Sequence, residues 1–242
     1  NYVCLLAELY YATGQESYKT EALTYASVIK DGGWVLDYEN SEDLAMYHLA
    51  KFGNATALAE FNKSTTRYKN AFSGGVMQVG SDWGRLRYTA SACFILALQH
   101  SLTNDGLIHN ALKGSVDYIL GVNSQSQSFV VGFGSKAPQK PHHRNVFMND
   151  NQNYTIPTKN KQHGYLVGGV WTGTFPDNID NYQTSEGGID YNAGLVGALG
   201  YINSIKSPVD QSKFGIFNCK SPQLGADKSL CGLTSIQLQS GL

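Results

Sequence analysis

Apolar side chains recur at helical spacing through most of the first 121 residues. Segments with one apolar face are 2–13, 16–30, 41–52, 56–68 and 105–121. Gly14 suits a left-handed C-terminal cap, and both Ser41 and Asp105 suit N-terminal caps. Residues 83–101 are apolar on nearly every side, which is typical of a buried inner helix. The pattern predicts successive helical hairpins.

The periodicity disappears between Gly121 and Ser185 and returns in a last helix from about Gly187 to Lys206. The intervening stretch is rich in Gly, Pro, Asn, Ser and aromatic residues, with short strands such as 128–133 as one option. Irregular segments of this length inside a domain are often functional. Seven helices without heptads or sustained strands predict an all-α protein, built as a helical barrel or toroid.

Composition narrows the range of partners. The formal net charge is -1, and no basic patch stands out, so nucleic acid is not an expected partner. No apolar run approaches the roughly 18 residues of a membrane span, and no signal peptide is visible. The chain opens at Asn1 inside a helical pattern without an initiator Met, which suggests that upstream sequence is missing.

The cysteines and glycosylation sequons add little to the prediction of function. Cys4 and Cys93 lie in apolar helical runs, where free thiols are common. Cys219 and Cys231 flank a loop-like part of the tail, where a disulfide and two free thiols are both compatible with the sequence; no metal-ligand spacing occurs. Sequons occur, about as often as chance predicts, at Asn54, Asn62 and Asn153.

Two parts of the irregular stretch concentrate polar chemistry. In residues 128–144, His142, His143 and Arg144 supply hydrogen-bond donors that suit sugar hydroxyls or a carboxylate, although a solvated basic turn has the same composition. In residues 175–194, Asp177 and Glu186 lie among aromatic residues just before the last helix. Glu186 has two interpretations: it complements the helix macrodipole, or desolvation prepares it as a general acid.

These segments resemble the two signatures of glycoside hydrolase family 9, whose members are mostly cellulases of the endoglucanase type. The first signature is matched by Ser128, Val130, Val131, Gly134, Lys136, Pro141, His142 and Arg144. The second is matched by Phe175, Asp177, Tyr182, Glu186, Asn192 and Ala193. Shorter matches occur at 7–14, 83–88, 117–123 and 194–199, so that the resemblance covers residues 1–206 and leaves 207–242 as an unassigned tail.

The resemblance implies an (α/α)6 barrel that hydrolyses β-1,4-glucan with inversion. In that mechanism a carboxylic acid protonates the leaving oxygen while a carboxylate activates water on the opposite face. It implies that Glu186 is the acid, that Asp177 and His142 belong to the catalytic site, and that Arg144 contacts the sugar; Tyr182 and Trp83 are further sugar-contact candidates, with packing roles as the alternative. It also implies secretion. No cofactor is assignable, because no calcium-loop spacing locates the structural calcium found in some relatives.

The chain departs from the family pattern in three places. Gly187 and Gly188 follow Glu186, and Asn178-Ile179 replaces a common Asp-Arg pair. The family's catalytic base lies in an Asp-Ala-Gly-Asp segment that is absent from these 242 residues. We therefore expect about the C-terminal half of the barrel, an isolated chain without activity, and the other half of the domain as its partner.

Two alternatives to a β-1,4-glucanase stay open, and the departures motivate only the first. One is a non-catalytic glucan-binding protein of the same fold. The other is a glycosidase or lyase of another helical-toroid family, which the two signatures disfavour.

Overall fold

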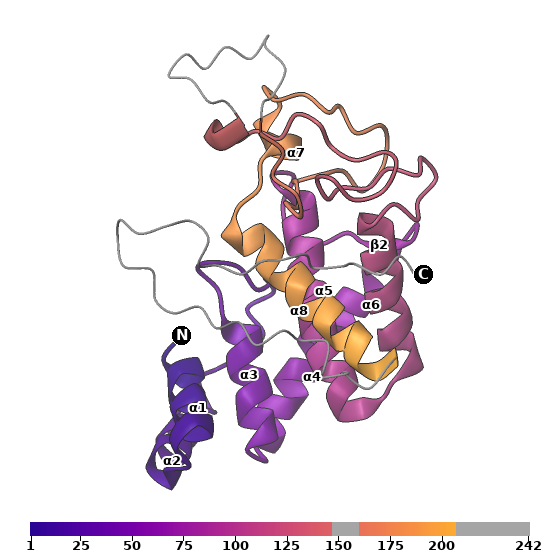
Figure 1. Ribbon diagram of the computed structural model, residues 1–242. Helices are drawn as coiled ribbons and strands as arrows, with labels where there is room; N and C mark the ends of the chain where they lie inside the picture. Colours follow the sequence, from indigo (N-terminus) through magenta and orange to yellow (C-terminus); the bar gives the residue numbers. More distant parts are fainter. Residues whose placement is uncertain (147–159, 207–242) are drawn as a thin grey trace, which may run out of the picture. The chain divides into compact units, whose positions relative to one another are not determined.

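The computed structural model describes residues 1–146 and 160–206 (Figure 1). The seven predicted helices are present, together with a short additional helix, α7. The helices are α1 (Tyr2–Thr13), α2 (Glu16–Thr24), α3 (Glu42–Lys51), α4 (Ala55–Asn70), α5 (Arg85–Thr103), α6 (Gly106–Ile119), α7 (Tyr182–Ser185) and α8 (Ile189–Lys206). The chain also has a 3-10 helix, η1 (Arg144–Val146), and a hairpin of β1 (Phe72–Ser73) with β2 (Val76–Met77), which the sequence pattern did not predict.

Residues 1–203 form one compact unit, and the second unit, 204–242, lies mostly in the undescribed tail. The predicted boundary at residue 206 therefore stays a prediction.

The helix ends follow local capping chemistry, with one difference from prediction. Gly14 adopts φ 70° and donates its N–H to the carbonyl of Tyr10, as a left-handed cap should. The Asp105 carboxylate accepts the N–H of Leu107 at the start of α6. Ser41 occupies the cap position of α3, but its hydroxyl donates to Asn1. The side chain of Asn40 accepts the Glu42 N–H instead.

Helix α5 is the centre of the core, as its uniformly apolar sequence predicts. It is buried on most of its circumference and packs along α6. Helix α8 lies across α5, in front of it in Figure 1. A Cβ atom at Gly194 would come within 2.6 Å of the Ala90 backbone carbon, so only glycine permits this close crossing. Burial also raises the pKa of the Cys93 thiol, which keeps it a neutral apolar group in the core.

The irregular segments gather at the end of the bundle where α5 and α8 begin and α6 ends (Figure 1). Residues 128–133 form no named strand, and Val130 makes only an isolated antiparallel bridge with Leu166. Val131 donates its N–H to Tyr165, and Gly164 donates to Val131. These backbone hydrogen bonds hold the irregular segments together at this end of the molecule, where helix packing does not.

A buried carboxylate, Asp43, ties α3 to α4. It is 2% exposed and accepts hydrogen bonds from the hydroxyls of Ser64 and Tyr68. The Tyr68 hydroxyl also lies 3.0 Å from the carbonyl of Trp34, so the network reaches the loop before α3. Burial raises the pKa of Asp43, although the two hydroxyl bonds oppose this by stabilising the charged form.

Replacing Asp43 with alanine is expected to lower the free energy of unfolding by about 2–4 kcal/mol, because two buried hydroxyls lose their acceptor. Urea denaturation measures this difference. Glu39→Ala, an exposed carboxylate in the neighbouring loop, serves as the control and should change stability by less than about 0.5 kcal/mol.

The Asp43→Ala difference should also depend on pH. Because the folded pKa of Asp43 is raised, the folded state holds a proton at a pH where the unfolded chain has released it. The difference from wild type should therefore grow as the pH falls through the folded pKa towards the ordinary value of about 3.9. A difference that shrinks over this range contradicts the assignment.

Candidate active site

Glu186 lies in the loop end of the molecule, immediately after α7. Its N–H donates to the Tyr182 carbonyl, and its own carbonyl accepts the Gly168 N–H at 2.7 Å. Helix α8 begins only at Ile189, and the acidic residue of its first turn is Asp190. Asp190 therefore complements the helix macrodipole, and that explanation for Glu186 does not hold.

Gly187 is required by the packing around Glu186. A Cβ atom at this position would lie 2.4 Å from the Leu166 carbonyl oxygen and 2.7 Å from the ring of Tyr165. The Tyr165 hydroxyl donates to the Gly187 carbonyl, and burial raises its pKa to about 12, so that it stays a donor. Gly187 and Gly188 precede α8, which begins at Ile189 rather than at the predicted position near Gly187.

Two aromatic side chains stand beside the Glu186 carboxylate. The indole N–H of Trp83 donates to Oε2 of Glu186 at 2.6 Å. The rings of Trp83 and Tyr182 lie 4.8 Å apart with their planes tilted by 51°. Trp83 is 46% exposed and Tyr182 43% exposed, so both offer ring surface to a ligand. The structure thus brings three of the predicted site residues together.

His142 joins this group through its backbone and its ring. Its N–H donates to the Ser185 carbonyl, which places it in a parallel bridge with Glu186. The ring Nδ1 lies 2.6 Å from the Ile179 carbonyl oxygen. Since a carbonyl only accepts, Nδ1 carries a proton, and Nε2 is left to face a ligand or solvent.

Asp177 and Arg144 occupy different surroundings from Glu186. Both carboxylate oxygens of Asp177 accept the Gln139 N–H at 3.0 Å, and Oδ1 also accepts the N–H of Lys140. Asp177 therefore anchors the loop that carries His142. The Arg144 side chain is exposed at the start of η1 and forms no ion pair with a residue that the structure describes.

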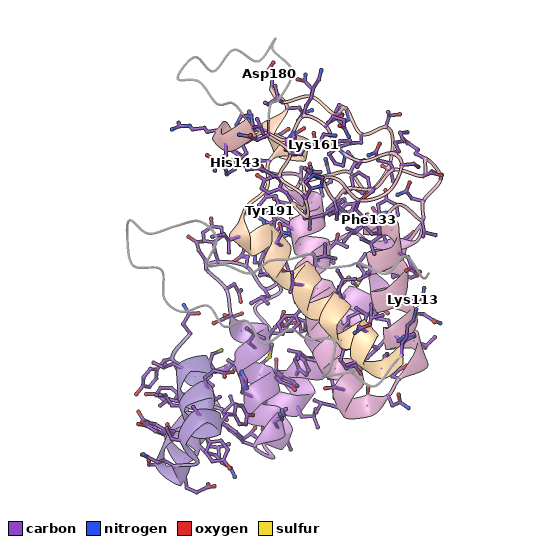
Figure 2. The ribbon with its side chains drawn as sticks, in the orientation of Figure 1. Lys113, Phe133, His143, Lys161, Asp180 and Tyr191 are labelled. Carbon is purple, nitrogen blue, oxygen red and sulfur yellow. The ribbon has the colours of Figure 1, made fainter. Side chains whose placement is uncertain are left out.

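The sequence pattern did not predict an ion pair that joins the first turns of α5 and α8. Arg87, only 13% exposed in its side chain, pairs with Asp190 at 3.2 Å, and its guanidinium carbon lies 4.8 Å from the ring centre of Tyr191. The Tyr191 hydroxyl lies so close to Gly84 that a Cβ there would approach it to 2.4 Å. Figure 2 shows Tyr191 at the start of α8, below the loops. The only sequence signal was the matching segment 83–88.

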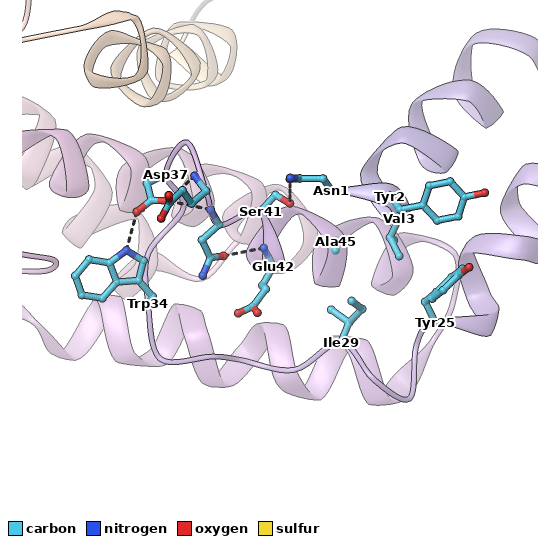
Figure 3. Close-up of a pocket in the computed structure, with 12 residues that line it drawn as sticks. Asn1, Tyr2, Val3, Tyr25, Ile29, Trp34, Asp37, Ser41, Glu42 and Ala45 are labelled. Atoms are coloured by element: carbon cyan, nitrogen blue, oxygen red, sulfur yellow. Dashed lines mark hydrogen bonds between the residues drawn. The ribbon is translucent and has the colours of Figure 1, made fainter.

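A separate cavity of about 570 Å³ lies between the start of α1, the end of α2 and the loop before α3 (Figure 3). Asp37, Glu39 and Glu42 contribute to its lining, and none of the predicted site residues does. Across residues 1–146 and 160–206, no three His, Cys, Asp or Glu side chains gather as metal ligands. Within the same ranges, no helix is long and apolar enough to cross a membrane.

Only some of the predicted modification sites lie among the residues that the structure describes. The Asn54 side chain caps α4, and the Asn62 side chain accepts a hydrogen bond from Gln99. Asn153, Cys219 and Cys231 lie outside the described residues. Glycosylation and the disulfide stay predictions, while Cys4 and Cys93 are free thiols.

Helical hairpins whose irregular loop end holds a carboxylate, a histidine and exposed aromatic rings place the protein in the class of α-helical barrels. The family model described as glycosyl hydrolase family 9 matches residues 4–199. The chain belongs to this family.

Relatives and solved structures support this assignment. Endoglucanase 4 of Bacillus sp. (strain KSM-522) is 30% identical over 214 residues, covering 78% of this chain and 33% of that protein. An endoglucanase of Dictyostelium discoideum is 32% identical over 210 residues, covering 79% of this chain and 28% of its own length.

Among solved structures, the cellulase Cel9M of C. cellulolyticum in complex with cellobiose aligns with a TM-score of 0.76 and 29% identity. The alignment covers 84% of this chain and 50% of that one. Endoglucanase CelQ of Clostridium thermocellum complexed with cellotriose aligns with a TM-score of 0.74 and 28% identity, covering 84% and 38%. The chain thus spans about a third of the first relative and about half of Cel9M, and the prediction of a partial (α/α)6 barrel is confirmed.

Replacing Asp177 with alanine is expected to release the loop that carries His142. The amide protons of Gln139 and Lys140 should exchange with solvent about tenfold faster or more, because hydrogen bonds to a charged group contribute about 1.5–3 kcal/mol. Hydrogen exchange followed by NMR measures this. Asp180, an exposed carboxylate at the outer edge of the loops in Figure 2, provides the control variant Asp180→Ala. Equal exchange in both variants contradicts the anchoring role.

Proposed function

We propose that this chain carries the general-acid side of the active site of an endo-β-1,4-glucanase that acts with inversion. The observation that carries the proposal is the Glu186 carboxylate, held at the loop end of the barrel beside Trp83, Tyr182 and His142. A carboxyl group that protonates a glycosidic oxygen must be reachable by a chain-like substrate and flanked by surfaces that bind sugar faces. The half-exposed Glu186 and its two exposed aromatic neighbours meet both needs.

The relatives point to the same reaction. Several are named endoglucanases, and two solved neighbours hold cellobiose or cellotriose. Their substrate class, β-1,4-linked glucose, is the partner that we propose for the protein. We also propose that it acts outside the cell, where an insoluble polysaccharide is accessible.

Each site residue has a proposed role that follows from its surroundings. Glu186 donates a proton to the leaving oxygen. His142 presents Nε2 to a sugar hydroxyl, since its Nδ1 is committed to the Ile179 carbonyl. Trp83 and Tyr182 pack against glucose rings, and Asp177 holds the loop of His142 in place.

Arg144 is proposed as a further sugar contact, through its exposed guanidinium. The general base, which must sit roughly 6.5–9.5 Å from the acid, lies in the part of the family domain that this chain does not match.

The protein that contains this chain should release reducing ends from a soluble cellulose derivative, and NMR should detect the α-anomer first. Glu186→Gln should lower kcat by about 10²–10⁴-fold, since general acid catalysis contributes about that much. Binding of cello-oligosaccharides, measured by calorimetry, should be largely preserved, because the amide keeps the shape of the side chain.

Asp180→Asn is the matched control, since it removes an exposed carboxylate from the same loop. Near-normal activity of Glu186→Gln would remove Glu186 from the acid role. Binding without hydrolysis by the wild-type protein would instead identify a glucan-binding protein of the same fold.

A further inference from the structure

The hydrogen bond between Trp83 and Glu186 distinguishes the two carboxyl oxygens of Glu186. The Trp83 Nε1–H donates to Oε2 at 2.6 Å. Oε1 accepts no hydrogen bond from any residue of the ranges 1–146 and 160–206. One oxygen is therefore engaged by the protein, and the other is open to a ligand.

The indole nitrogen acts only as a donor, and this limits where a proton can sit on Glu186. A protonated Oε2 pointing at the indole would place two donors against each other. The hydroxyl oxygen of a carboxylic acid is a weaker hydrogen-bond acceptor than its carbonyl oxygen, so the indole N–H favours the acid form in which Oε1 carries the proton and Oε2 keeps accepting from Trp83. A tyrosine or histidine in the same place would impose no such choice, because each can both donate and accept.

The backbone around Trp83 holds the indole in this position. Gly84 donates its N–H to the Gln183 carbonyl at 2.9 Å, which joins the segment of Trp83 to α7. The Arg87–Asp190 ion pair closes the same junction one turn further along. The donor and its acceptor thus come from two segments that are bonded to each other on both sides of the contact.

We propose that Trp83 is a positioning residue for proton transfer, because its indole N–H fixes the Glu186 carboxyl and directs the acidic proton to Oε1. This rests on the proposed function and goes beyond sugar stacking. In the transfer, the proton on Oε1 passes to the glycosidic oxygen as the bond from the anomeric carbon breaks, and the bonding electron pair goes to that oxygen. Water adds to the anomeric carbon from the opposite face and gives its proton to the general base, and Glu186 is left as a carboxylate.

The decisive variant is Trp83→Phe, which keeps a flat aromatic ring and removes the N–H donor together with part of the ring surface. With a cello-oligosaccharide whose leaving group needs protonation, kcat should fall about tenfold while KM stays within about twofold. With an aryl cellobioside that releases an electron-poor phenol, such as 2,4-dinitrophenol, the fall in kcat should be much smaller than with the cello-oligosaccharide, because this leaving group departs without a proton. A role in sugar stacking or folding alone would affect both substrates equally, and that result overturns the proposal.

Trp171→Phe is the matched control. The Trp171 indole N–H donates to the Thr89 hydroxyl at 3.0 Å, so this variant also loses one indole hydrogen bond, away from Glu186. It should leave the ratio of the two activities unchanged. If Trp171→Phe changes the ratio of the cello-oligosaccharide activity to the aryl cellobioside activity as much as Trp83→Phe does, Trp83 has no specific role.

NMR separates failure of this inference from failure of the proposed function. The Trp83 indole proton, identified by its loss in Trp83→Phe, should move upfield in Glu186→Gln, where a neutral amide replaces the carboxylate. The indole protons of Trp34 and Trp171, which bond to Asp37 and Thr89, serve as internal references. An unshifted Trp83 proton overturns the positioning role whether or not the protein hydrolyses glucan. A shifted proton without any glucanase activity overturns the proposed function while the hydrogen bond stands.

Discussion

The candidate site depends on the junction between the first turn of α5 and the segment that runs from α7 into α8. A backbone hydrogen bond joins Gly84 to Gln183, and the Arg87–Asp190 ion pair joins α5 to α8. Leu86 also donates its N–H to Gly168, in the loop that precedes α7. These contacts bring together residues that are more than 80 positions apart in the chain. Because the hydrogen bonds are directional and the Arg87 side chain of the ion pair is mostly buried, the two segments have little freedom to slide. The position of Glu186 follows from that constraint.

Irregular backbone forms this end of the molecule, yet it is not loosely held. Asp177 accepts two backbone N–H groups, and Asn192 joins α8 to the preceding loop by accepting from Leu166 and donating to the Gly164 carbonyl. Polar side chains here do the work that a regular hydrogen-bond ladder does elsewhere. The second family signature therefore includes residues that shape the loops as well as Glu186 itself.

Glycine has a particular role in this arrangement. Gly187 permits the Leu166 carbonyl to approach the backbone beside Glu186, and Gly194 permits α8 to cross α5 at close range. The sequence pattern predicts Gly187 as the first residue of the last helix. In the structure it lies outside the helix, at a position where any side chain would displace the loop against which Glu186 is held.

Local pattern determined the helices, because apolar periodicity and caps such as Gly14 and Asp105 act within a few residues. The resemblance to the two family signatures identified Glu186, His142 and Asp177 as candidate site residues. Neither could show that Asp177 binds backbone N–H groups, that Asn40 rather than Ser41 caps α3, or that Trp83 donates to Glu186. These hydrogen bonds depend on which segments meet in the folded chain. Contacts between segments far apart in the sequence are set by the packing of α5 against α8 rather than by neighbouring residues.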